Sequence, residues 1–112
     1  MAYSEPYDAI DEKTKDVSRA ITSLREELEA VDWYNQRANT TKDQSLRDIM
    51  AHNRDEEIEH AAMLIEWLRR NMNGFDGELK TYLFTSGSLL DVEESGAAEG
   101  TETPSMKIGD LK

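Results

Sequence analysis

The sequence predicts an all-α protein built on an antiparallel two-helix hairpin with a short third helix near its carboxyl end. Two long stretches repeat apolar residues at the spacing of an amphipathic helix. Only a few residues that favour caps and turns separate these stretches, and so short a connection makes neighbouring helices antiparallel. A chain of 112 residues with 38% hydrophobic content also buries too little surface to be comfortably stable alone, so association is expected.

The first helix is expected over residues 7–38, where apolar positions are separated by three, four or seven residues. These apolar residues are Ile10, Val17, Ile21, Leu24, Leu28 and Val31. Pro6 stands where a helix can begin, because the fixed φ of proline suits the first turn. The run ends at residues 39–41, whose polar side chains compete for backbone hydrogen bonds.

A second helix is expected to follow at once. Thr41 and Gln44 have the three-residue spacing of a capping box. Arg69 and Arg70 suit the carboxyl end of the helix, where the helix dipole is negative. The buried side of this helix is marked by Leu46, Ile49, Met50, Ala61, Leu64, Ile65 and Leu68.

Three segments are expected along the chain. The helical domain occupies residues 1–94 and ends in the short third helix, whose apolar residues are Phe75, Leu79, Tyr82 and Leu83. Residues 95–105 form a small, polar, glycine-bearing linker with nothing to pack. In the last segment, 106–112, apolar residues return, so a partner is expected to bind there. An ordinary frayed terminus is the alternative.

Charge and composition exclude several classes of partner. The 24 acidic and 13 basic residues give a formal net charge of -11, which repels nucleic acids and anionic membranes. The sequence has neither a secretion signal nor an apolar run long enough to cross a membrane. The chain contains no cysteine, so a disulfide framework and a thiolate metal site are both excluded. We therefore expect a soluble cytoplasmic protein whose natural ligands are cations.

Polar residues interrupt the centre of each apolar stripe. In steps of three and four, the second helix presents Leu46, Met50, Asn53, Glu57, His60, Leu64 and Trp67. The first helix presents Ala20, Leu24, Glu27, Val31 and Tyr34. Inward carboxylates are costly unless a cation compensates them, which favours a bound metal.

The spacing of Glu57 and His60 is that of a Glu-x-x-His element, which brings both side chains to one side of a helix. Ferritin-like carboxylate bundles combine two such elements with one further Glu from each of two other helices. This chain contains one element and one matching carboxylate, Glu27, so a complete site requires two chains related by a two-fold axis. The alternative is that Glu27 pairs with a nearby Arg or Lys and that the other two side chains are partly exposed members of a charged helix.

Two further acidic groups lie on other faces of the helices. Glu26, Glu29 and Trp33 share one face of the first helix and could collect cations near an entrance. A solvated acidic face, with Trp33 covering a subunit contact, is the alternative. On the second helix, His52, Glu56 and Glu59 could bind a metal weakly, although plain solvation is the favoured interpretation.

Long stretches of the chain resemble the encapsulated ferritins of bacteria and archaea. The resemblance is carried by EELEAVDWY at residues 26–34, HNRDEEIEHAA at 52–62, WLRR at 67–70 and TYLF at 81–84. It implies two-helix chains that pair into a ferritin-like four-helix bundle, with a di-iron ferroxidase centre between them. It also implies assembly as a ring of five dimers.

Carried onto this sequence, the resemblance makes Glu27, Glu57 and His60 the iron ligands, with Tyr34 close to the centre. Two iron ions are implied for each pair of subunits, and calcium or zinc could substitute for them. The resemblance places Glu26, Glu29 and Trp33 in a metal-entrance region.

The carboxyl-terminal segment resembles the cargo-loading peptide by which such proteins dock inside an encapsulin shell. It comprises residues 106–112, with Asp110 where a small serine is more usual. The expected function is oxidation of Fe(II) to Fe(III), with oxygen as acceptor and iron mineral stored inside an encapsulin nanocompartment. The alternatives are a non-catalytic metal-binding helical dimer and a shell adaptor.

Overall fold

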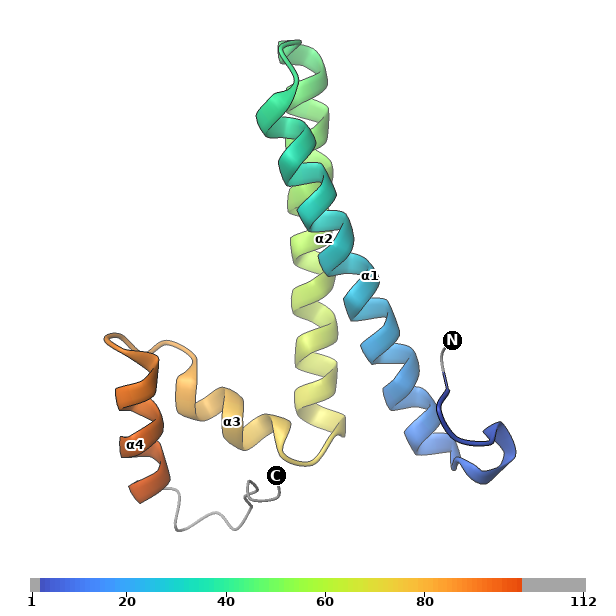
Figure 1. The fold of residues 1–112 in the computed structure, drawn as a ribbon, viewed down its shortest axis with the longest axis vertical. Coiled ribbons are helices and arrows are strands. Elements are labelled where there is room, and N and C mark those ends of the chain that lie inside the picture. The colour runs from blue at the N-terminus through green and yellow to red at the C-terminus, as the bar shows by residue number, and fades with distance from the viewer. Residues whose placement is uncertain (1–2, 100–112) are drawn as a thin grey trace. The chain divides into compact units, whose positions relative to one another are not determined.

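The computed structural model describes residues 3–99, and every regular element within that range is helical (Figure 1). The elements are η1 (Tyr7–Ala9), α1 (Glu12–Thr40), α2 (Gln44–Asn71), α3 (Phe75–Tyr82) and α4 (Leu89–Glu99). The chain divides into two compact units, Met1–Leu68 and Arg69–Lys112. The predicted all-α fold class is confirmed.

The first long helix begins later than the apolar spacing indicated. Asp11 is its N-cap, and the Asp11 carboxylate accepts a 2.8 Å hydrogen bond from the backbone N–H of Thr14. Ile10, just before the cap, has extended backbone angles, so residues 7–9 form a separate 3-10 turn. The helix therefore starts at Glu12 because a side-chain cap ends the preceding turn.

A buried lysine lies near the amino end of α1. The ammonium of Lys15 lies 3.8 Å from the centroid of the Tyr7 ring and 3.4 Å from a carboxylate oxygen of Glu12. The ring face and the carboxylate both favour the positive charge, which offsets part of the cost of burying it. These contacts join the 3-10 turn to the first turns of α1.

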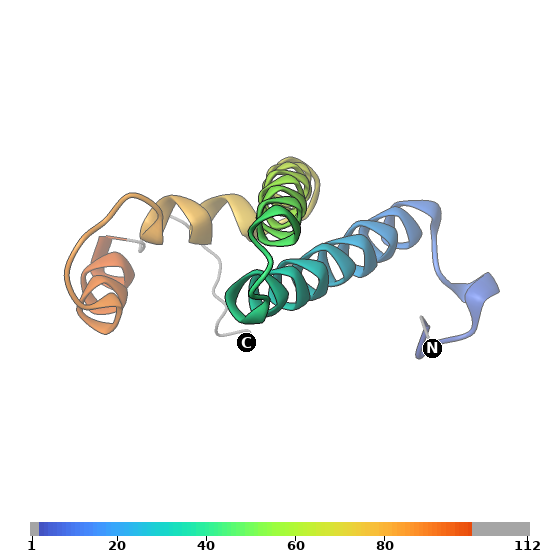
Figure 2. The ribbon, with the colours of Figure 1, turned by 90° about the horizontal axis from the view of Figure 1, so that it is seen from above.

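The connection between α1 and α2 is short, and the two helices run in opposite directions (Figures 1 and 2). They are closest at this connection and draw apart toward the other end of the hairpin. The expected capping box of Thr41 and Gln44 is replaced by a different cap. Asp43 accepts a 2.8 Å hydrogen bond from the backbone N–H of Leu46, while the hydroxyl of Thr41 accepts one of 3.3 Å from the N–H of Asp43. A carboxylate is an effective N-cap, and here it lies one residue before the helix.

The second unit contains α3, α4 and the turn that precedes them. Gly74 begins α3 with a φ of 96°, a left-handed conformation that glycine adopts without steric cost. The short helix was predicted, but α4 was not. Helix α4 continues to Glu99, so the expected linker of residues 95–105 begins with helical residues. The remainder of that linker and the predicted cargo-loading peptide at 106–112 lie outside the described residues.

Helices α3 and α4 approach each other closely at Gly96. A Cβ added at Gly96 would lie 2.7 Å from Cγ2 of Thr81, so a larger residue would force one helix to shift. Between the helices, Phe84 adopts a left-handed φ of 64° and is wholly exposed. Within residues 3–99, no helix is long and apolar enough to cross a membrane.

Replacing Asp76 should remove a pH-dependent contribution to the stability of the second unit. The carboxylate of Asp76 pairs with the guanidinium of Arg69 and, at 3.1 Å, with the ammonium of Lys80. These hydrogen bonds, led by that of Arg69, hold the pKa of Asp76 below its ordinary value. A depressed pKa stabilises the folded state above the ordinary value of about 4, and this contribution is lost as the pH falls through the folded-state pKa.

The expected result is that Asp76→Asn lowers the unfolding temperature at neutral pH, with a smaller difference from wild type at about pH 3. Thermal unfolding followed by circular dichroism, at one protein concentration, measures this difference. Asp32→Asn is the control, because it makes the same charge change and keeps an acceptor for the Gln36 amide. A deficit of the same size at both pH values would contradict the assignment.

Candidate metal centre

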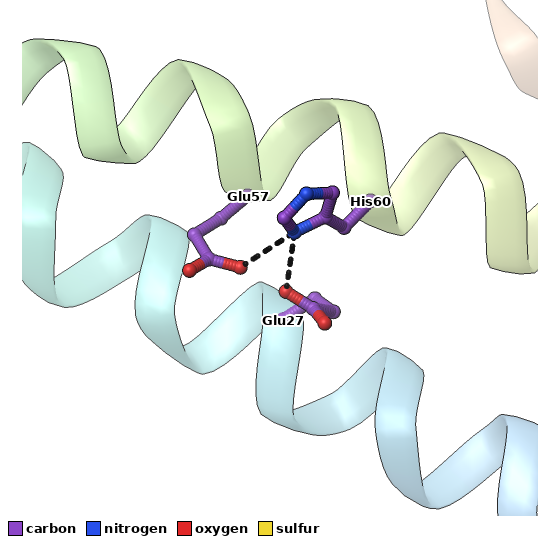
Figure 3. A group of neighbouring side chains, drawn as sticks. All are labelled: Glu27, Glu57 and His60. Atoms are coloured by element: carbon purple, nitrogen blue, oxygen red, sulfur yellow. Dashed lines mark hydrogen bonds and ion pairs between the residues drawn. The ribbon is translucent and has the colours of Figure 1, made fainter.

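Glu27, Glu57 and His60 meet between the two long helices (Figure 3). Glu27 comes from α1, whereas Glu57 and His60 lie one turn apart on α2. Nδ1 of His60 is 3.3 Å from Oε1 of Glu57 and 3.5 Å from Oε1 of Glu27. One ligand atom from each residue lies within 4.8 Å of the other two, so all three could reach a single ion.

Helical periodicity and one hydrogen bond between the two helices position these side chains. The spacing of Glu57 and His60 places them on the same side of α2, and the antiparallel turn brings the middle of α1 opposite them. Nearby, the guanidinium of Arg54 donates a 3.0 Å hydrogen bond to the side-chain oxygen of Asn35. This bond joins α1 to α2 within one turn of Glu57.

Hydrogen bonds and nearby charges shift the pKa values of all three side chains in the cluster. A hydrogen bond with Glu57, followed by partial burial, raises the pKa of Glu27. The same hydrogen bond lowers the pKa of Glu57, and His60 lowers it further. The pKa of His60 is raised, chiefly by its hydrogen bond with Glu57 and then by the negative charges of both carboxylates. A cation placed among the three residues would relieve the repulsion between the two carboxylates.

This donor set suits a divalent metal that retains open coordination positions. Carboxylate oxygens and imidazole nitrogen are ligands for Fe(II), Mn(II) and Zn(II). The side chains are only half-buried, with 26% of Glu27, 25% of Glu57 and 41% of His60 exposed. Three ligands on an accessible surface leave room for further ligands and for a second reactant.

Tyr34 and the expected entrance residues lie outside this three-residue cluster. Tyr34 is half-buried two turns beyond Glu27 on the same stripe of α1, whereas Glu26, Glu29 and Trp33 are exposed. Within the part of the chain that the structure describes, Glu26 and Glu29 do not lie in a group of three or more possible metal ligands. The proposed roles of these four residues remain predictions.

Two neighbours of the site were missed by sequence reasoning. The guanidinium of Arg37 lies 5.7 Å from the ring centroid of Trp33 and 5.6 Å from that of Tyr34. Arg37 follows these aromatic residues by four and three positions, a spacing that could have indicated the contact. The second neighbour is Glu56, which was expected to be solvated. Its Oε1 lies 4.0 Å from Nε2 of His60, four residues along the same helix.

Comparison with known proteins identifies a family and several relatives. Residues 2–86 match the EncFtn-like family. A ferritin-like protein of Thermotoga maritima is 56% identical over 101 residues, covering 88% of this chain and 89% of the relative. An encapsulated ferritin-like protein of Rhodospirillum rubrum is 52% identical over 94 residues, covering 84% of this chain and 67% of the relative.

A solved structure agrees with these sequence matches. The crystal structure of a protein from Nitrosomonas europaea superposes with a TM-score of 0.76 and is 60% identical. The match covers 80% of this chain and 98% of the other. At this level of identity the helical fold and much of the sequence are shared.

If the three-residue cluster binds metal, Zn(II) should raise the unfolding temperature of the wild type. Glu57→Gln and His60→Ala should each abolish most of that rise. A ligand that binds only the folded state stabilises it more when it binds more tightly, and each substitution removes one ligand of the metal. Differential scanning calorimetry with and without Zn(II) gives the measurement. Glu59→Gln, an exposed change on the same helix, is the matched control and should retain the rise. A rise that survived both ligand substitutions would place the metal elsewhere.

Proposed function

This chain belongs to the EncFtn-like family, and we propose on that premise that it is a ferroxidase, an enzyme that oxidises Fe(II) to Fe(III). The proposal rests mainly on the meeting of Glu27, Glu57 and His60 between α1 and α2. Iron is the substrate, and each chain supplies half of the ligands that hold it. The family supports iron, with which the donor types are compatible, and zinc and calcium are proposed only as substitutes.

The ligand count supports a site shared by two chains. One chain offers two carboxylates and one imidazole in the cluster, so a two-fold pair offers four carboxylates and two imidazoles. That is the set found in ferritin-like di-iron bundles. We propose that the pair forms a four-helix bundle with two iron ions at its interface. A ring of five such dimers, implied by the resemblance, is part of the same proposal.

Exposed apolar side chains on the hairpin provide an independent reason for pairing. In the range 3–96, the buried apolar residues of the hairpin are Ala20, Ala38, Ala61 and Leu68. Near the cluster, 51% of Leu28, 49% of Ile58 and 58% of Met63 remain exposed in one chain. Burying such side chains against a second copy would supply hydrophobic free energy that a single hairpin lacks.

Each cluster residue has a proposed role in the reaction. Glu27 and its two-fold mate bridge or flank the iron ions, while Glu57 and His60 hold one ion from their own chain. Binding of the cation favours the deprotonated form of Glu27, whose pKa is raised by its hydrogen bond with Glu57 and by partial burial. Each Fe(II) then loses one electron to dioxygen, the proposed acceptor, and Fe(III) leaves for mineral storage. Tyr34 is proposed to lie beside the completed centre.

Storage is proposed to take place outside the bundle, within an encapsulin shell. The relative from Rhodospirillum rubrum is named an encapsulated ferritin-like protein, which supports this location. Residues 106–112 are the proposed cargo-loading peptide that binds the shell. The proposed localisation is a cytoplasmic encapsulin nanocompartment in which the oxidised iron accumulates.

Purified protein should oxidise Fe(II) in air much faster than iron oxidises in buffer alone. Absorbance of Fe(III) follows the reaction, and light scattering establishes the assembly state of the same sample. Glu27→Gln should lose most of the activity, because it replaces an anionic ligand with a neutral one of the same size. Glu59→Gln should remain active as the matched control.

The outcomes distinguish the rival functions. A wild-type rate equal to that of buffer would refute the ferroxidase. If Zn(II) or Fe(II) still bound stoichiometrically, the non-catalytic metal-binding dimer would replace it. If no metal bound, the shell adaptor would be the remaining function. Full activity in Glu27→Gln would instead refute the ligand assignment.

The acidic residues at the proposed entrance should affect iron capture more than turnover. Glu26→Ala with Glu29→Ala should raise the KM for Fe(II) at low salt and leave kcat nearly unchanged, because the removed charges attract the cation before it binds. The difference should shrink above about 0.15 M salt, where charges are screened beyond roughly 8 Å. Stopped-flow oxidation across iron and salt concentrations gives both constants.

Glu93→Ala with Glu94→Ala is the charge-matched control for this effect, because it removes two exposed carboxylates from α4. It should leave the KM unchanged at each salt concentration. An equal effect from both double variants would mean that net charge, and not a local entrance, attracts iron.

A further inference from the structure

The two ring nitrogens of His60 face different carboxylates. Nδ1 lies toward Glu57 at 3.3 Å and Glu27 at 3.5 Å, while Nε2 lies 4.0 Å from Oε1 of Glu56. We propose that Glu56 is a positioning residue, which holds the His60 imidazole with its proton on Nε2 so that Nδ1 can bind metal. This inference rests on the proposed function, because it gives a role to a residue behind the metal ligand.

The tautomer of an imidazole ring decides which of its nitrogens can bind a metal. A neutral ring carries one proton, so only the other nitrogen has a lone pair to give to a metal. In the cluster, Nδ1 faces the two proposed metal-binding carboxylates, and it must therefore be the unprotonated nitrogen when metal binds. Without metal, Glu27 and Glu57 favour a proton on this same Nδ1. An acceptor beside Nε2 is needed to favour the opposite tautomer.

Glu56 meets that need through its position on α2. It precedes His60 by four residues, so helical geometry places the two side chains on neighbouring turns of one face. Glu57, the adjacent residue, points toward the metal cluster instead. Two consecutive glutamates thus approach opposite nitrogens of one imidazole. Metal-binding histidines commonly donate their second N–H to a carboxylate, which orients the ring.

The 4.0 Å separation is an ion-pair distance and is longer than a hydrogen bond. About half of the Glu56 side chain is exposed, so a small rotation could shorten the contact and a water molecule could bridge it. Hydrogen bonds of this kind are often long without substrate and shorten when the site is loaded. Glu56 is thus placed to accept a hydrogen bond from Nε2–H.

The test is the tautomer of His60 in the metal-free full-length protein, read from ring nitrogen chemical shifts in ¹⁵N NMR. Spectra are recorded at about pH 9, above the ordinary histidine pKa. The chain has two histidines, so His52→Ala assigns the signals. The wild type should carry a measurable share of its protons on Nε2 despite the two carboxylates that face Nδ1, and Glu56→Ala should shift the population further toward Nδ1. Glu56→Gln should largely restore the wild-type tautomer, because its amide oxygen still accepts a hydrogen bond.

A second readout is Zn(II) affinity by isothermal titration calorimetry, which requires no iron oxidation. Glu56→Ala should weaken binding about tenfold, as expected for loss of a residue that orients a ligand, and Glu56→Gln should weaken it less. Glu59→Ala, with the same loss of charge, should change neither tautomer nor affinity. A wild type with no detectable proton on Nε2, or a tautomer population that is unchanged in Glu56→Ala, would overturn the inference. Equal effects of Glu56→Ala and Glu59→Ala would also overturn it.

These measurements separate the inference from the ferroxidase proposal. A tautomer shift with weakened Zn(II) binding supports the role of Glu56 even if the wild type oxidises no iron. Conversely, rapid oxidation by the wild type with no tautomer change in Glu56→Ala preserves the enzyme and removes the positioning residue.

Discussion

Two helices packed as a hairpin cover each other along only one stripe, and this geometric limit governs the rest of the molecule. The buried apolar residues of the hairpin are small alanines with one leucine, while larger side chains on the flanks remain exposed. Such a hairpin gains little hydrophobic free energy by itself. Its central stripe is also the place where Glu27, Glu57 and His60 face one another. The hairpin therefore leaves apolar side chains exposed and brings two carboxylates together in its central stripe.

The electrostatics of the cluster follow from this placement. Two carboxylates that meet across the hairpin cannot both remain ionised at low cost, so the pKa of Glu27 rises while that of Glu57 falls. The imidazole relieves part of the repulsion, and its own pKa rises. Moderate exposure keeps these costs tolerable without metal and leaves the ligands accessible to a second chain.

Helical periodicity made the hairpin and the site predictable from sequence. The spacing of Glu57 and His60 determines a shared face, and the short connection determines which part of α1 lies opposite. The residue that caps the start of each helix was harder to predict, because several nearby polar side chains could serve. Asp11 interrupts an apolar pattern that otherwise continues from Ile10, and Asp43 caps α2 in place of Thr41.

Two other features lie beyond periodicity. Helix α4 lacks a long amphipathic repeat, and its close approach to Thr81 depends on the small size of Gly96. Glu56 lies between the inward and outward faces of α2, so only its side-chain rotamer decides whether it approaches His60. Sequence spacing restricts the direction of such a residue but does not select the rotamer. Sites at the border of a helix face are therefore the ones that a sequence pattern assigns least well.

Under the proposed pairing, each metal centre takes its ligands from two chains, and this division has a genetic consequence. Because each centre draws on both chains, a copy defective at Glu27 would also disable the normal copy with which it pairs. A mutant allele expressed beside the wild type would then reduce activity by more than its own share of the protein. Conversely, two chains with different ligand defects could not complement each other within one pair, since every mixed centre would still lack ligands.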